Sequence, residues 1–101
     1  MTASVQIDGS TGRLMLSGQF DFSAHRDFRQ ACDEVLAADQ VNEVLVDFQH
    51  VDYLDSSALG MLLLLKEKAA AAGKSLALVN CRDTVRQVLE IACFGKIFTI
   101  R

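Results

Sequence analysis

From Val44 to Gly60 the chain reads VLVDFQHVDYLDSSALG. Val44 to Phe48 are almost continuously apolar and rich in valine, which is typical of a strand covered on both faces rather than one half open to water. After a short link, Gln49 to Leu54, Asp55 can cap a helix that is apolar on several sides and must therefore be largely buried or docked. We expect a central parallel strand and then a helix that ends at Ala72-Gly73.

The residues before this stretch predict a hairpin and a helix. Val5 and Ile7 alternate with polar residues before the turn-forming segment 8–12, and the apolar residues 14–16 resume an extended pattern after it, so we expect a β-hairpin over residues 3 to 17. From Ser23, which can serve as an N-cap, apolar residues recur at helical spacing. This spacing predicts an amphipathic helix that continues to about Ala38.

The residues after this stretch predict one more strand, a third helix and a short last strand. The strand covers Ser75 to Val79. A helix can start at Asp83 or Thr84, and Phe94-Gly95 stops it. Residues 97 to 100 then form a short strand or an ordered tail.

The order of these elements predicts an α/β fold with a mixed β-sheet, on which α-helices pack, and which opens with a β-hairpin. Strand–helix–strand alternation calls for parallel pairing through right-handed crossovers. With 101 residues the chain has the length of one domain, residues 1–101.

Charge and hydropathy argue against two classes of partner. The net charge is −3 and the basic residues are scattered from Arg13 to Arg101, so there is no basic stripe for a nucleic acid. The longest apolar run, Ala58 to Leu65, is far shorter than the roughly 20 residues that a membrane-spanning helix needs. The first residues lack the features of a secretory signal, so we expect a cytoplasmic protein without direct membrane insertion.

The residue types that carry catalysis or bind metals do not cluster in the sequence. Cys32, Cys81 and Cys93 show no metal-binding spacing, and we interpret them as small core residues. His25 and His50 are far apart and have no partner at ligand spacing. We therefore expect no catalytic residue, no metal and no cofactor, and a protein that is not an enzyme.

The segment Val51 to Gly60 departs from ordinary core and surface patterning. It places Asp55, Ser56 and Ser57 at a helix start next to a buried strand, where α/β folds usually bind ligands and partners. The same three residues are also an ordinary capping cluster. The residues alone leave both interpretations open.

Three segments together resemble the STAS family of anti-anti-sigma factors. They are Gly18-Gln19-Phe20-Asp21, Val44 to Phe48, and Tyr53 to Gly60, and the last is similar to the family's Asp-Ser-Ser-Gly-Leu-Gly signature. The resemblance covers nearly the whole chain. One departure is Ala58, where the family usually has glycine; alanine is the better helix former, and its methyl group could limit which partner packs at this corner.

The resemblance implies a single-domain cytoplasmic switch, an anti-sigma factor antagonist of STAS fold. In such a switch a serine kinase, often the anti-sigma factor itself, phosphorylates the signature serine, and a serine phosphatase restores it. By position the phosphorylated residue is Ser56, with Ser57 as the second choice. The unphosphorylated protein would bind the anti-sigma factor and the phosphorylated protein would release it, with the antagonist a monomer that forms hetero-complexes.

The partner-binding residues expected with Ser56 are Asp21, Asp55, Ser57, Ala58 and Tyr53. Each of the two aspartates could instead be a plain helix cap, and Asp55 could also orient the acceptor hydroxyl or help to bind the kinase's metal. Tyr53 could be a hydrophobic plug with a wet hydroxyl. A second function, a cytoplasmic STAS accessory subunit of a membrane transporter of the lipid-trafficking type, remains open.

Overall fold

The computed structural model describes all residues from Met1 to Arg101. The strands are β1 (Thr2–Asp8), β2 (Thr11–Phe20), β3 (Glu43–Leu54), β4 (Ser75–Val79) and β5 (Thr99–Ile100). The helices are α1 (His25–Ala37), α2 (Ser56–Ala71) and α3 (Asp83–Ile91), with 3-10 turns η1 (Phe22–Ala24) and η2 (Phe94–Lys96). The order of these strands and helices confirms the predicted α/β fold that opens with a hairpin.

The five strands form one sheet in the order β1-β2-β3-β4-β5, which is also their order in the chain. β1 and β2 pair antiparallel, and every later pair is parallel. β3 is therefore the central strand, as its apolar sequence predicts.

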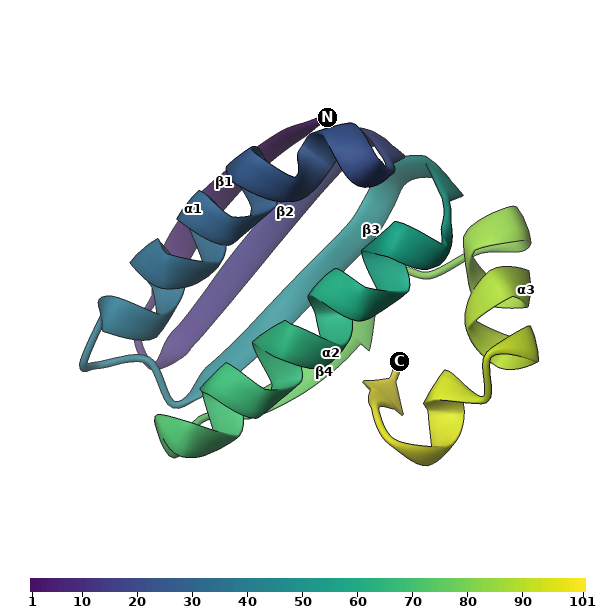
Figure 1. The fold of residues 1–101 in the computed structure, drawn as a ribbon. Coiled ribbons are helices and arrows are strands. Elements are labelled where there is room, and N and C mark those ends of the chain that lie inside the picture. Colours follow the sequence, from purple (N-terminus) through teal and green to yellow (C-terminus); the bar gives the residue numbers. More distant parts are fainter.

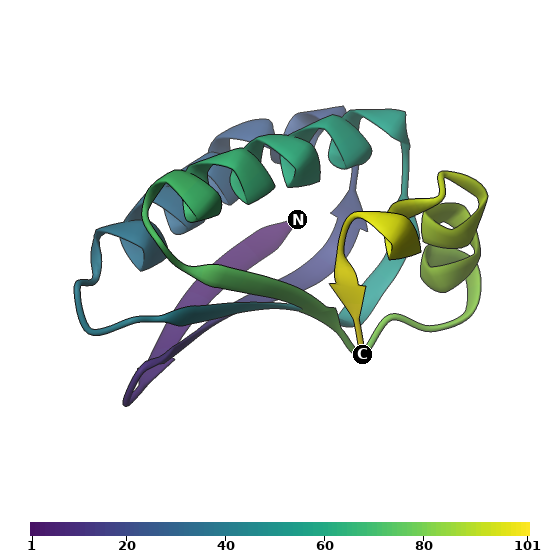
Figure 2. The same ribbon diagram turned by 90° about the horizontal axis from the view of Figure 1, so that it is seen from below.

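The helices leave one face of the sheet without a covering layer. α1 and α2 lie side by side over the same face, and α3 lies beside the end of the sheet (Figures 1 and 2). The main core lies between this helical layer and the sheet. No helix in the molecule is both long and apolar enough to cross a lipid bilayer.

Val44 to Phe48 are all buried, although helices cover only one face of the sheet. On the other face, neighbouring side chains cover the residues of β3 that point away from the helices. Leu45 packs there with Ala77 and Val79 in a small second cluster. Beside this cluster, the carboxylate of Asp47 accepts hydrogen bonds from Arg13 (2.9 Å), from Asn80 (3.0 Å) and from the backbone N–H of Gln49 (2.9 Å). Neighbouring side chains, not a second helical layer, thus cover this part of β3.

The link predicted over Gln49 to Leu54 is instead the second half of β3. The pairing of β2 with β3 continues to Phe20 and Leu54, with two register shifts on the way. As a result, the buried residues in this half of β3 are Phe48, Val51 and Leu54, and two exposed residues separate each of them from the next. The repeat of three has neither the period of a strand nor that of a helix, so the sequence pattern is typical of a loop.

Two smaller expectations are also wrong. Ser23 is not the cap of the first helix, because it lies inside η1 and Asp21 caps that turn. Cys93 is exposed, unlike the buried Cys32 and Cys81. α3 ends at Ile91, so Cys93 lies beyond it in a left-handed conformation (φ 61°).

Candidate functional site: the N-terminus of helix α2

The ends of β2 and β3 bring two helix starts together. Gln19 pairs with Tyr53 and Phe20 with Leu54, and the backbone N–H of Asp55 donates to the carbonyl of Phe20 (3.2 Å). The residues that follow, Asp21 and Asp55, therefore start η1 and α2 at the same edge of the sheet. The sequence segments that contain Asp21 and Asp55 are thus close in space.

Asp55 is the N-cap of α2. Its backbone is extended (φ −112°, ψ −177°), and its Oδ1 accepts a hydrogen bond from the backbone N–H of Ala58 (3.2 Å). This bond satisfies one of the free N–H groups at the helix start, which confirms the capping interpretation.

Ser56 is the first residue of α2 and is exposed, and its hydroxyl makes no hydrogen bond within the chain. Ser57 is half-buried. A group added to the hydroxyl of Ser56 would lie at the helix N-terminus, where N–H groups and the helix dipole favour negative charge. The structure thus makes Ser56 the more accessible of the two serines.

Ala58 does not belong to the exposed surface. Its side chain is fully buried in the main core, so the expectation that its methyl group limits which partner packs at this corner is wrong. The burial follows from the helical period, because Ala58 lies two residues after Ser56 and faces away from solvent. Its backbone N–H takes part in the site only as the donor to Asp55.

Asp21 is also a cap. Its Oδ1 accepts hydrogen bonds from the hydroxyl (2.6 Å) and from the backbone N–H (2.9 Å) of Ser23. The hydroxyl bond is the largest cause of a lowered pKa of Asp21, so this carboxylate stays charged. Asp52 and Asp55 are two further carboxylates near this end of β3, where Arg82 lies beside Asp52.

A family model described as "Mlab, STAS domain" matches residues 3–99. The chain belongs to the STAS-domain family. A curated STAS-domain containing protein of Pseudomonas aeruginosa (strain UCBPP-PA14) is 41% identical over 100 residues, which cover 99% of this chain and 97% of that protein. An anti-sigma F factor antagonist of Paenibacillus polymyxa is 24% identical, over 99% of this chain and 87% of that protein.

Solved structures of STAS proteins share the fold. An anti-sigma factor antagonist from Mycobacterium paratuberculosis superimposes with a TM-score of 0.85 at 22% identity, over 98% of this chain and 83% of the other. The antagonist SpoIIAA in its unphosphorylated form gives 0.73 at 21% identity, over 99% and 87%. A sulfate transporter family protein from Wolinella succinogenes gives 0.74 at 15% identity, over 94% and 80%.

Sequence reasoning missed one residue at the site of this STAS domain. Phe22 lies in η1, directly after Asp21, and its side chain is 78% exposed. Tyr53 is 46% exposed and so does not plug the core. The sequence offers one signal for the exposure of Phe22: it is an aromatic residue that does not fit the spacing of the apolar residues in the helix after it. Of the apolar residues nearby, Leu54 is buried, while Met61 is half-buried between α1 and α2.

Proposed function

We propose that this protein is a cytoplasmic anti-sigma factor antagonist, a single STAS domain that binds its partner when Ser56 is unphosphorylated and releases it when Ser56 carries phosphate. The observation that carries the proposal is the exposed Ser56 hydroxyl at the capped start of α2. The family assignment and the fold shared with anti-sigma factor antagonists support it.

The partner would contact the surface around Ser56. Phe22 and Tyr53 supply exposed aromatic side chains there, and aromatic residues carry a large part of the binding energy in many interfaces. Asp21 and Asp55 contribute mainly by holding the two helix starts in place. The protein needs no catalytic group of its own, because the kinase and the phosphatase supply the chemistry.

Phosphorylation would act on the interface rather than on the fold. A phosphate adds a charge of about −1.5 to −2 at Ser56. The helix N-terminus favours this charge, while Asp52 and Asp55 nearby repel it. A partner surface shaped for a neutral hydroxyl would have to desolvate the dianion, and each 1.4 kcal/mol of that cost lowers the affinity about tenfold.

Mass spectrometry of the protein from its native host tests the modification. We expect the intact mass to show a phosphate adduct that phosphatase treatment removes, and fragment mapping to place it on Ser56. Phosphate on Ser57 with none on Ser56 would contradict the assignment.

Titration with the co-purified partner tests the switch. Ser56→Asp should weaken binding at least tenfold, because it places a permanent negative charge at the interface that the partner would have to desolvate. Ser57→Asp, a matched control one residue later and half-buried, should weaken it less. Equal effects of the two changes would argue against a switch centred on Ser56.

A second candidate is an accessory subunit of a membrane transporter, which the shared fold with the Wolinella succinogenes transporter protein supports. In that case the protein would stay unmodified across growth conditions and co-purify with a membrane complex. This outcome would contradict the phosphorylation switch and support the transporter-subunit function.

A further inference from the structure

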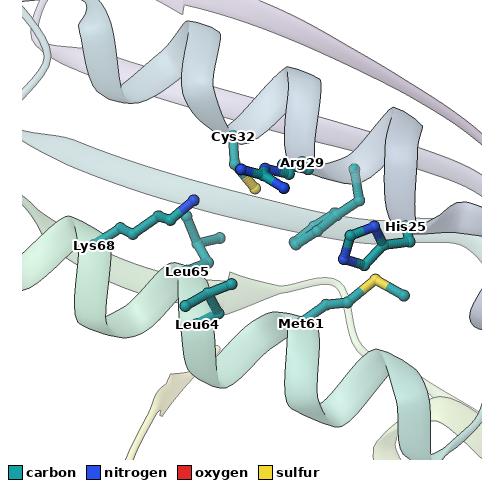
Figure 3. Close-up of a pocket in the computed structure, with 8 residues that line it drawn as sticks. His25, Arg29, Cys32, Met61, Leu64, Leu65 and Lys68 are labelled. Carbon is teal, nitrogen blue, oxygen red and sulfur yellow. The ribbon is translucent and has the colours of Figure 1, made fainter.

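A groove between α1 and α2 lies next to the candidate site. Its floor and walls are mostly apolar, and three basic side chains line it: His25, Arg29 and Lys68. Figure 3 shows the side chains of the two helices facing each other across it, with Met61 and Leu64 on the α2 side. Met61 follows Ser56 by five residues, about 7.5 Å along the helix axis at 1.5 Å per residue.

The size of the groove indicates what can occupy it. Its cavity measures about 50 Å³. Small-molecule and cofactor sites enclose roughly 300–1,000 Å³, so the groove is too small for such a ligand. It has room for part of one aliphatic side chain of a partner protein.

The α2 side of the groove continues into an exposed apolar surface. Leu63 and Leu64 are 41% and 46% exposed, although most leucines of this chain are buried. α2 is apolar on more sides than the sheet and α1 can cover. A partner helix that lies along α2 would cover these two leucines and insert a side chain beside Leu64.

Charge is separated between the two flanks of α1. His25 and Arg29 face the groove, while Asp27 and Glu34 line the opposite flank, next to β1. Arg29 makes no ion pair within the chain, and Lys68 has one long contact with the exposed Asp33 (3.7 Å). A molecule with a net charge of −3 thus has a basic border around this apolar groove.

We propose that the groove binds an acidic amphipathic helix of the partner protein, with one apolar side chain in the cavity and carboxylates paired with Arg29 and Lys68. The proposal rests on the proposed function, because the partner is the protein whose binding Ser56 controls. The groove would supply affinity and selectivity, and Ser56 at its end would supply the control.

Site-specific photo-crosslinking identifies the contact. A photoreactive amino acid at position 63 in the native host should crosslink to a partner segment with carboxylates at helical spacing, and mass spectrometry of the crosslinked peptide gives its sequence. A crosslinked segment that is basic or uncharged would overturn the proposal.

Binding of the purified, crosslink-identified partner tests the energetics. Arg29→Glu and Leu64→Asp should each weaken binding at least tenfold, whereas Arg26→Glu, the same charge change on α1 outside the groove, should leave it within about twofold. The charge-reversed partner, in which lysine replaces the carboxylate of the crosslinked segment that pairs with Arg29, should bind the Arg29→Glu variant again. Equal losses for Arg26→Glu and Arg29→Glu, or no rescue, would overturn the proposal.

Two further measurements separate the alternatives. Ser56→Asp in the same titration reports on the switch alone: if it has no effect while the groove variants do, the groove proposal stands and the switch fails. Flotation with phosphatidylglycerol vesicles reports on lipid binding. Flotation that Arg29→Glu abolishes, without a change in partner affinity, would assign the groove to an anionic membrane surface and overturn the proposal.

Discussion

Ser56 is held at the surface by the residue before it. Because Asp55 caps α2 from an extended conformation and Phe20 fixes its backbone N–H, the first helical residue has a defined place and direction. A kinase can reach its hydroxyl without unfolding of the helix. The proposed modification site is therefore preformed.

Phe22 is the residue at which we expect a large effect on binding without an effect on folding. Its side chain is 78% exposed, so Phe22→Ala removes few contacts within the molecule. If it is an anchor for the partner, the change should lower affinity by about 2 kcal/mol, roughly 30-fold. Calorimetric titration of the co-purified partner measures this value.

The control for Phe22 is Ile91→Ala, which removes another highly exposed apolar side chain, on α3. It should leave partner affinity unchanged. Urea unfolding of both variants should match that of the unchanged protein. An unchanged affinity of Phe22→Ala would remove Phe22 from the interface.

At the scale of elements, two glycines make opposite predictions. A Cβ at Gly12 in β2 would overlap Val35 Cγ2 and come within 3.2 Å of Val41, whereas one at Gly60 in α2 would meet no atom within 4 Å. Gly12→Ala should thus destabilise the protein by about 1–3 kcal/mol through overpacking between the sheet and the end of α1. Gly60→Ala should stabilise it by about 0.5–1 kcal/mol, because alanine is the better helix former.

Urea denaturation of the two variants gives both free energies of unfolding. A Gly12→Ala variant as stable as the unchanged protein would mean that α1 can move away from β2 at no cost. A destabilised Gly60→Ala variant would show that the space beside Gly60 is not free.

The elements also show where sequence reasoning succeeds. β4 has its predicted bounds, and α2 starts and ends where Asp55 and Gly73 predict, because each boundary has a local chemical cause. The sequence does not predict the second half of β3, because its register depends on β2. Asp21 and Ser23 are both good caps by residue type, and only the structure shows that Asp21 is the one used. Asp55 and Ser56 could be predicted from sequence, whereas the exposure of Phe22 and the burial of Ala58 depend on tertiary packing.

At the scale of the whole molecule, the hydrogen bonds of Asp47 with Arg13 and Asn80 join β3 to β2 and to the end of β4 on the helix-free face. Burial alone would raise the pKa of Asp47, but hydrogen bonds from Asn80, from the N–H of Gln49 and from Arg13 outweigh it and lower the pKa. A carboxylate with a lowered pKa in the folded state stabilises the fold above its unfolded pKa of about 3.9, and this contribution is lost as the pH falls through the folded value.

Asp47→Asn should therefore lower the free energy of unfolding at pH 7 by about 1–2 kcal/mol, because Arg13 loses its charged partner. It should also make stability less dependent on pH below about 4. Urea denaturation between pH 7 and pH 3 measures both effects. Asp39→Asn, an exposed residue without an ion pair, is the control, and an equal pH dependence of the two variants would contradict the role of Asp47.

The agreement between strand order and chain order has a consequence for how the protein forms. Each strand pairs with the strand that comes next in the chain, but only the hairpin of β1 and β2 is local, since Thr11 pairs with Glu43 and Glu43 with Ser75 across a helix. Loop-closure entropy makes the hairpin the least costly pairing to form, whereas the parallel pairings, which close across a helix, form more slowly. During synthesis the hairpin can therefore form first and each later strand can add to a finished edge, and the parallel pairings set the rate at which the sheet is completed.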